Sequence, residues 1–292
     1  MSLLKWFSNN VKKVFSKRNP LKFLVVHLFK KIIRVISTLF PTFLDIVPII
    51  YRKGNFKLRL APTLLSYVMY EYEEVREEDE KFIASLLKDG DVYIDVGANV
   101  GNTTLSAAYA VGNSGHVYSY EAHPRTYKYL QRSIACNQNF ISRITTKNVA
   151  LGEKRGEVFF TDLQNDDINK VSDVGKVKVQ METLDEQKLP THINILKIDV
   201  EGYEFFVLKG AQHLLNNTDI LIFESYTKNY ETFDVTLKEV ISYLHDLGFV
   251  IYKKLERNNI AKIKEDYHSL DCEDLIACKD ENILTGKGLK IG

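Results

Sequence analysis

Residues 90–104 of the chain are Gly-Asp-Val-Tyr-Ile-Asp-Val-Gly-Ala-Asn-Val-Gly-Asn-Thr-Thr. Strand-forming residues at 92–96 lead into a tight turn with Gly97, Asn99 and Gly101, and small residues at helical spacing follow. A strand that meets a helix through such a turn exposes backbone N–H groups, and its glycines let a ligand approach the main chain. The stretch therefore predicts the opening strand, turn and helix of a nucleotide-binding α/β unit.

The rest of the chain continues this alternation of strand and helix. We expect a mostly parallel seven-stranded sheet with helices on both faces. A hairpin, with strands at 157–161 and 176–181, interrupts the alternation. The acidic residues at 71–80 precede the first strand of the sheet and are expected to form a solvated helix face. The seven expected strands span 92–96, 117–120, 144–149, 193–198, 219–223, 250–253 and 274–278.

Composition and cysteine usage place the chain among folded globular proteins. Hydrophobic residues make up 45% and charged residues 26% of the 292 residues, without low-complexity tracts. The three cysteines, Cys136, Cys272 and Cys278, have neither CxxC spacing nor an even count. They indicate reduced thiols in a cytoplasmic protein and argue against a disulfide scaffold or a cysteine metal site.

The charge is distributed unevenly along the chain. Residues 1–60 contain thirteen lysines or arginines and one acid, Asp45, a net charge of +12. The rest of the chain has 26 basic and 37 acidic residues, a net charge of −11. We therefore expect a basic N-terminal extension, residues 1–60, and a main domain, residues 61–292. Within the extension, 2–18 and 21–40 have the apolar spacing of amphipathic helices.

Three interpretations of this basic extension remain open. Its apolar runs are too short to cross a bilayer, and no secretory signal is evident. A basic amphipathic arm with aromatic residues fits a peripheral anchor at an anionic membrane surface, on the cytoplasmic face. Alternatively, the helices form a cap whose apolar side packs on the main domain. Nucleic-acid binding is a weaker third alternative, because no recognised motif accompanies the charge.

Five of the expected strands end in a polar residue. In an open parallel sheet, a ligand binds beyond the carboxyl ends of the strands. Glu121, after the second strand, is placed to accept both hydroxyls of a ribose, which fits NAD and S-adenosylmethionine equally well. Asp95, two residues before the first glycine, would attract a sulfonium cation and repel a pyrophosphate. The five strand-end residues are Asp95, Glu121, Asn148, Asp199 and Glu224.

Several motifs resemble the FkbM-type methyltransferases, which are class I, S-adenosylmethionine-dependent enzymes. The resemblance covers about residues 65–280 and implies a Rossmann-like class I methyltransferase fold; the N-terminal helical extension lies outside it. At Ala122-His123 the chain departs from the family, in which proline more often follows the acid directly. The motifs are Asp-Val-Gly-Ala-Asn-Val-Gly at 95–101, Tyr-Glu-Ala-His-Pro at 120–124, Asn-Val-Ala-Leu at 148–151, and Leu-Lys-Ile-Asp-Val-Glu-Gly-Tyr-Glu at 196–204.

The resemblance implies S-adenosylmethionine as the cofactor and a set of residues that hold it. Asp95 and the turn 97–101 would bind the methionine portion, Glu121 the ribose, and residues 148–150 the edge of the adenine. Asp199 would lie beside the transferred methyl group. The expected cofactor-binding residues are Asp95, Gly97, Ala98, Asn99, Gly101, Thr103, Glu121, Ala122, Asn148 and Ala150.

The resemblance also implies O-methylation of a hydroxyl on a sugar, a glycan or a related small molecule. A hydroxyl is a weak nucleophile at neutral pH, so a base or a metal must assist. We rank Asp199 first as the general base, Glu201 second and Glu224 third. Asp199, Glu201 and Glu204 are an alternative group of oxygen ligands for a divalent cation, but we assign no metal ligand. An RNA methyltransferase that uses the basic extension, and a non-catalytic binding module, are the other hypotheses.

Overall fold

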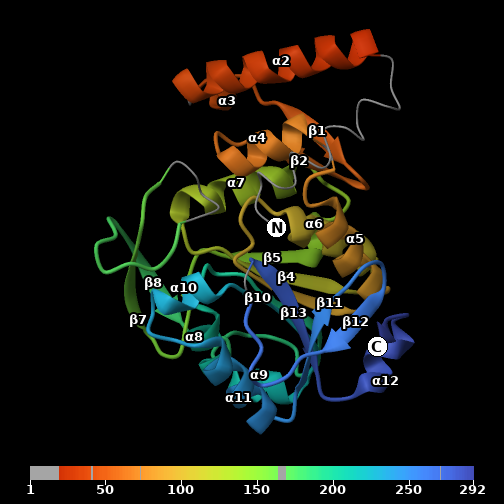
Figure 1. Cartoon of the computed structure of the whole chain (residues 1–292). Coiled ribbons are helices and arrows are strands. Elements are labelled where there is room, and N and C mark those ends of the chain that lie inside the picture. Colours follow the sequence, from red (N-terminus) through yellow and green to blue (C-terminus); the bar gives the residue numbers. More distant parts are fainter. Residues whose placement is uncertain (1–19, 41, 73, 164–168, 270) are drawn as a thin grey trace.

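The computed structural model describes residues 20–292 except 41, 73, 164–168 and 270. An N-terminal layer of helices and a hairpin lies on a larger α/β body (Figure 1). The helix expected at 2–18 falls outside the described residues. Among the described residues, no helix has the length and apolar character needed to span a membrane.

A nine-stranded sheet in the order β14-β12-β11-β13-β10-β9-β3-β4-β5 forms the centre of the body. The strands from β10 to β5 are all parallel, whereas β13 runs antiparallel between β10 and β11. The strands are β3 (Val92–Val96), β4 (His116–Tyr120), β5 (Ile144–Lys147), β9 (Ile193–Ile198), β10 (Thr218–Ser225), β11 (Val250–Lys254), β12 (Asn259–Lys262), β13 (Glu273–Cys278) and β14 (Lys290–Ile291).

The seven expected strands are all present, but the sheet has nine strands, so the predicted number is wrong. The difference arises at one edge, where β12 pairs antiparallel with β11 and the two-residue β14 pairs with β12. Both added strands are short, and a two-residue strand has no periodicity that a sequence pattern would reveal.

Helices cover both faces of the sheet, as the alternation of strands and helices predicts. Successive side chains of a strand point to opposite faces. Ile94 of β3 therefore joins the apolar cluster beneath α8, α9 and α11, and Tyr93 joins the cluster beneath α5, α6 and α12. The helices are α5 (Glu77–Leu86), α6 (Asn102–Ala110), α7 (Pro124–Ala135), α8 (Glu204–Lys209), α9 (Gln212–Asn216), α10 (Thr227–Glu231), α11 (Leu237–Asp246) and α12 (Glu281–Gly286).

The predicted hairpin is also present, as part of a separate three-stranded sheet. β7 (Gly156–Phe160) pairs antiparallel with β8 (Val177–Glu182), and β6 (Ala150–Leu151) pairs parallel with the other edge of β8. Because β6 follows directly after β5, this small sheet stands beside the carboxyl ends of the central strands. It forms one wall of the cavity described below.

The N-terminal layer begins with α2 (Pro20–Leu39), which confirms the helix expected at 21–40. It continues through α3 (Phe43–Ile46), the hairpin β1 (Ile50–Lys53) with β2 (Phe56–Arg59), and α4 (Leu64–Glu71). Leu58 of β2 and Met69 of α4 share an apolar cluster with Leu105 of α6 and Leu130 of α7. The hairpin and α4 thus pack directly on the helices of the main sheet.

The expectation of a solvated acidic face at 71–80 is wrong at both ends of the stretch. The carboxylates of Glu71 and Glu80 are buried. Glu80 forms an ion pair of 2.7 Å with Lys53, which is itself buried on β1, and Glu71 lies 3.6 Å from Arg34 of α2. These two ion pairs link α2 to α4 and β1 to α5. Local sequence does not reveal such long-range pairs.

Candidate active site

The turn between β3 and α6 has the backbone conformation that its glycines and asparagine favour. Gly97, Asn99 and Gly101 have φ angles of +85°, +49° and +94°, a region that a residue with a Cβ rarely adopts. A Cβ atom on Gly97 would lie only 1.8 Å from the carbonyl oxygen of Asp199. The turn therefore lies directly against the end of β9, and glycine is required there for space as well as for φ.

Asp95 lies behind this turn rather than in the wall of the cavity. Its carboxylate is fully buried and accepts hydrogen bonds from the hydroxyls of Thr103 (2.8 Å) and Thr104 (2.6 Å). Burial raises the pKa of Asp95, although Lys197 opposes the shift. Its Oδ1 atom is buried and has no hydrogen-bond partner among the described residues. Asp95 thus holds the first turn of α6 through its Oδ2 atom, while its Oδ1 atom makes no hydrogen bond to the described residues.

Glu121, at the end of β4, holds two backbone N–H groups at once. Its Oε2 accepts from the N–H of Asn99 and its Oε1 from the N–H of His123, each at 2.9 Å. The carboxylate is thereby fixed across the glycine turn, at the place where the sequence predicts a ribose.

The segment after β5 contributes apolar residues to the cavity. Val149, Ala150 and Leu151 line it, whereas Asn148 does not. The Asn148 side-chain amide instead donates hydrogen bonds of 2.8 Å to the carbonyl oxygens of Glu121 and Ala122. Asn148 therefore positions the loop after β4, and the wall available to an adenine is made by its apolar successors.

A single cavity brings the strand ends together and encloses about 1110 Å³ of empty space, part of it open to solvent. The cavity includes most of the expected cofactor residues, namely Gly97, Ala98, Asn99, Thr103, Glu121, Ala122 and Ala150, together with Asp199 and Glu201.

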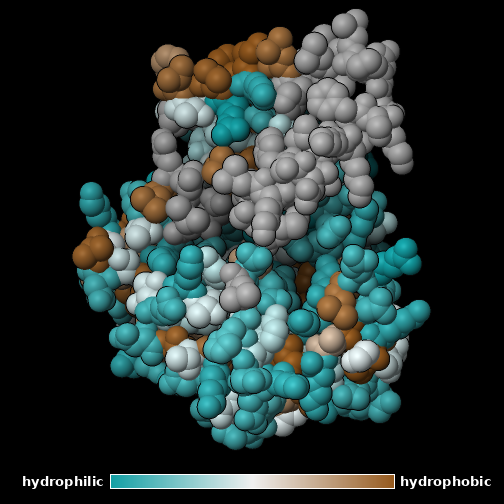
Figure 2. Space-filling model, viewed as in Figure 1, coloured by the Kyte–Doolittle hydropathy of each residue, from teal (hydrophilic) through white to brown (hydrophobic). Residues whose placement is uncertain are grey.

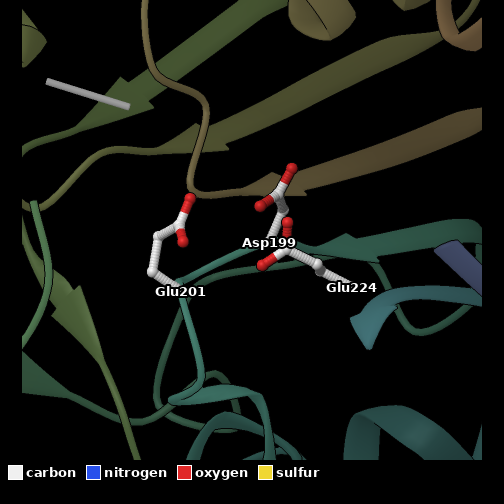
Figure 3. Close-up of side chains that lie close together, drawn as sticks. All are labelled: Asp199, Glu201 and Glu224. Atoms are coloured by element: carbon white, nitrogen blue, oxygen red, sulfur yellow. The ribbon is translucent and has the colours of Figure 1, made fainter. Parts of the chain in front are cut away.

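The three acids ranked as candidate bases lie close together, and two of them, Asp199 and Glu201, line the cavity. Asp199 follows β9, Glu201 lies two residues further on, and Glu224 lies near the end of β10. One carboxylate oxygen of each lies within 4.8 Å of the others, and Figure 3 shows the carboxylates of Asp199 and Glu224 close together with Glu201 to one side. Hard oxygen ligands at this separation suit a divalent cation such as Mg²⁺ or Mn²⁺.

Asp199 is held in its ionised form. Lys197, which is buried on β9, donates to Asp199 Oδ2 at 2.7 Å. Burial alone would raise the pKa of Asp199, but the charges of Lys197 and then Arg76 outweigh it and lower the pKa. Asp199 therefore presents a carboxylate to the cavity at neutral pH.

Glu224 has the opposite character. It is buried, and burial together with the charges of Asp199 and Glu201 raises its pKa well above the usual range. Its Oε1 accepts a 2.8 Å hydrogen bond from the thiol of Cys272, while Oε2 has no partner among the described residues. Asp199 and Glu224 thus form a neighbouring pair in which one carboxyl group is readily ionised and the other readily holds a proton.

Glu204, proposed above as a metal ligand, lies outside this group of acids. Its Oε1 accepts hydrogen bonds from the backbone N–H groups of Val200 (2.9 Å) and Gly202 (3.2 Å), which closes the turn before α8. Burial raises its pKa to about 8. The position expected for Glu204 is occupied by Glu224, which reaches the site from the neighbouring strand.

Sequence patterns missed several charged residues of the cavity, among them Arg76, Lys197 and Asp274. Asp274 is the second residue of β13, and because β13 pairs antiparallel with β10 it lies directly opposite Glu224. Arg76 approaches from the loop before α5 with a left-handed φ of +62°. Burial would lower its pKa, but the charges of Asp199, Asp79 and Asp274 raise it.

Comparison with known proteins agrees with this geometry. The methyltransferase FkbM domain family matches residues 95–251, more than half of the chain. The chain belongs to the FkbM methyltransferase family. Membership confirms the family, and with it the cofactor S-adenosylmethionine, expected from the motifs.

The individual proteins that the chain resembles are distant from it. The hexuronic acid methyltransferase AglP of Haloferax volcanii is 23% identical over 164 residues, which are 53% of this chain and 65% of that protein. An FkbM methyltransferase from Methylobacillus flagellatus is 16% identical, with a TM-score of 0.46, over 73% of this chain and 54% of that one. An S-adenosylmethionine-dependent O-methyltransferase from Thermotoga maritima is 20% identical, with a TM-score of 0.43, over 79% and 77%.

Proposed function

We propose that the protein transfers the methyl group of S-adenosylmethionine to a hydroxyl of a sugar, a glycan or a related small molecule. The observation that carries the proposal is the position of Asp199, which lines the cavity against the glycine turn with Glu201 and Glu224 close by. A hydroxyl bound there would meet an acceptor for its proton on the side where the methyl group is expected.

The reaction needs an in-line arrangement and a destination for one proton. The bond between sulfur and the methyl carbon breaks while the acceptor oxygen forms a bond to that carbon, and S-adenosylhomocysteine leaves. The hydroxyl proton passes to Asp199, which lines the cavity, and Glu224 is the neighbouring group with the higher proton affinity. We therefore assign proton removal to Asp199, which would contact the acceptor.

A divalent cation is the alternative way to activate the hydroxyl. Asp199, Glu201 and Glu224 are the residues that would hold it, and the unpartnered Oε2 of Glu224 fits a ligand role. Such a cation would lower the pKa of the bound hydroxyl. Turnover that is lost with EDTA and restored by Mg²⁺ or Mn²⁺ would favour the cation, whereas turnover unaffected by EDTA would favour the carboxylate pair.

The nature of the acceptor is supported by the relative that acts on hexuronic acid. A decisive screen would offer methyl-labelled S-adenosylmethionine with neutral sugars, hexuronic acids, lipid-linked sugars and RNA. We expect label in a sugar as an ether that survives mild alkali; a label released by alkali would indicate a methyl ester on a carboxyl group. Label found only in RNA would overturn the proposal. The proposal would also be overturned if the protein bound the cofactor in calorimetry but labelled none of these acceptors.

Asp199→Asn provides the chemical control for that screen. It should bind the cofactor but lose turnover by about 10²–10⁴-fold, the usual contribution of a positioned proton acceptor. Asp246→Asn makes the same change at an exposed carboxylate at the end of α11 and should keep full turnover. Equal turnover of the two variants would refute the role of Asp199.

A further inference from the structure

The side of α2 that contacts the rest of the protein is mainly polar, with one apolar residue, Ile33, buried in a cluster with Tyr67 and Tyr70. The Lys30 ammonium lies 5.0 Å from the ring centre of Tyr70, and the Arg34 guanidinium lies 5.8 Å from that of Tyr67. Arg34 also reaches Glu71, and Ser37 is fully buried. Cation–π contacts of this kind are favourable where the ring is partly shielded from water. Over its described side chains, α2 is therefore not a cap with its apolar side packed on the main domain.

The opposite side of α2 is apolar and exposed. Leu39 is 68% exposed and Val35 57%, and the apolar surface continues onto α3, where Ile46 is 79% exposed. Figure 2 shows this band of hydrophobic side chains along the top of the molecule, over α2. We call it the outer α2 face, made of Leu28, Phe29, Ile32, Val35, Ile36, Leu39 and Phe40.

A continuous apolar band on a soluble surface marks an interaction site, because water disfavours it. The charge of the surrounding chain indicates which partner. Residues 1–19 lead directly into α2 and contain five basic residues and no acid, and residues 1–60 carry a net charge of +12. A second copy of the chain would bring another +12 to the same place and would be repelled. An anionic surface would be attracted.

We propose that the outer α2 face docks on the interface of an anionic lipid bilayer. Its leucine, isoleucine and phenylalanine side chains would enter the boundary between headgroups and acyl chains, and basic side chains that do not contact the main domain, such as the exposed Lys31, would meet the lipid phosphates. An apolar face and a basic cluster together supply the two signals that stable but reversible membrane binding requires.

Docking by this face would also place the cavity close to the lipid. α2 rests on α4, and Leu65 and Met69 of α4 line the cavity wall. α2 itself and α4 thus lie between the docked face and the cavity.

The test measures binding of the full chain to vesicles and does not depend on catalysis. Vesicles of phosphatidylcholine with phosphatidylserine are sedimented with the wild-type protein and with the double variant Val35→Glu, Leu39→Glu. We expect the wild type to sediment with the anionic vesicles, and each substitution to weaken binding about tenfold or more. Both side chains are exposed, so the melting temperature should not change. Val174→Glu, at an 86% exposed residue in the loop between β7 and β8, is the matched control and should bind like the wild type.

Three outcomes would overturn the proposal. The double variant could bind as well as the wild type, which would leave only the charge of the extension as the attraction. The wild type could fail to bind anionic vesicles at low salt. Finally, light scattering without lipid could show a dimer that the double variant abolishes, which would assign the outer α2 face to a second copy of the chain.

Discussion

Replacing Glu121 by glutamine tests the centre of the cofactor site with an almost isosteric change. Both carboxylate oxygens of Glu121 accept backbone N–H groups, from Asn99 and from His123, at 2.9 Å. A glutamine has one acceptor oxygen and one NH₂ group. Whichever way the amide turns, its NH₂ faces an N–H donor, so one of the two backbone groups loses its partner.

The size of the effect follows from that loss. A buried donor without a partner, in place of a hydrogen bond to a charged group, costs about 1.5–3 kcal/mol. For a chain of this length the melting temperature should fall by roughly 3–10 °C. Asn99 has a left-handed φ of +49° that this hydrogen bond helps to hold, and the ribose would lose the same carboxylate. Affinity for S-adenosylhomocysteine should therefore fall by about ten- to a hundredfold.

Differential scanning fluorimetry and isothermal calorimetry measure the two quantities on the same preparations. Glu157→Gln is the matched control, because Glu157 forms its 2.6 Å ion pair with Lys178 on the exposed surface of β7 and β8. It should leave the melting temperature and the cofactor affinity unchanged. If Glu121→Gln bound S-adenosylhomocysteine as tightly as the wild type, the assignment of Glu121 to the ribose would be refuted.

Three further substitutions test other parts of the site. Gly97→Ala should abolish cofactor binding in calorimetry, because a Cβ 1.8 Å from a carbonyl oxygen forces the turn apart and the left-handed φ adds strain of about 1–3 kcal/mol; retained binding would contradict the close packing. Arg76→Gln removes a positive charge that lowers the pKa of Asp199, so the rise of kcat with pH should move to higher pH. If the pH dependence of kcat did not move, Arg76 would have no influence on the pKa of the catalytic base. Because burial raises the pKa of Glu204 to about 8, its folded form binds a proton more tightly than its unfolded form, and wild-type stability should fall as pH rises from about 4.5 to 8. Glu204→Gln, whose oxygen can keep both backbone hydrogen bonds, should flatten that decline in urea unfolding measured across this range, and an unchanged slope would show that Glu204 does not cause it.

The central sheet was predictable because most of its strands have a recognisable sequence pattern of their own. Runs such as 92–96 and 193–198 are mostly apolar because they are buried on both faces, and an aspartate, Asp95 or Asp199, lies within one residue of the end of each run. The glycine turn was predictable for a related reason, since its backbone conformation admits few residue types. The added strands β12 and β14 gave no comparable signal, because they depend on pairing with β11.

The composition of the acid cluster was harder to predict, because it depends on register between strands. Glu201 and Glu204 are neighbours in sequence, but a left-handed φ at Glu201 and the hydrogen bonds of Glu204 separate their roles. Glu224 and Asp274 meet only because β10 and β13 pair antiparallel at that position. In the same way, the amphipathic pattern of 21–40 revealed a helix with two sides but not which side would contact the protein.

The acid-rich end of the cavity has a consequence for the exchange of cofactor and product. In the proposed cofactor site, Glu121 and the walls after β5 would meet the same ribose and adenine before and after the reaction. The carboxylates of Asp199 and Glu201 would attract the sulfonium cation of S-adenosylmethionine, but not the neutral thioether of S-adenosylhomocysteine. Methyl transfer would therefore weaken the binding of the spent cofactor, and the positive charge of fresh S-adenosylmethionine would help it to displace the product.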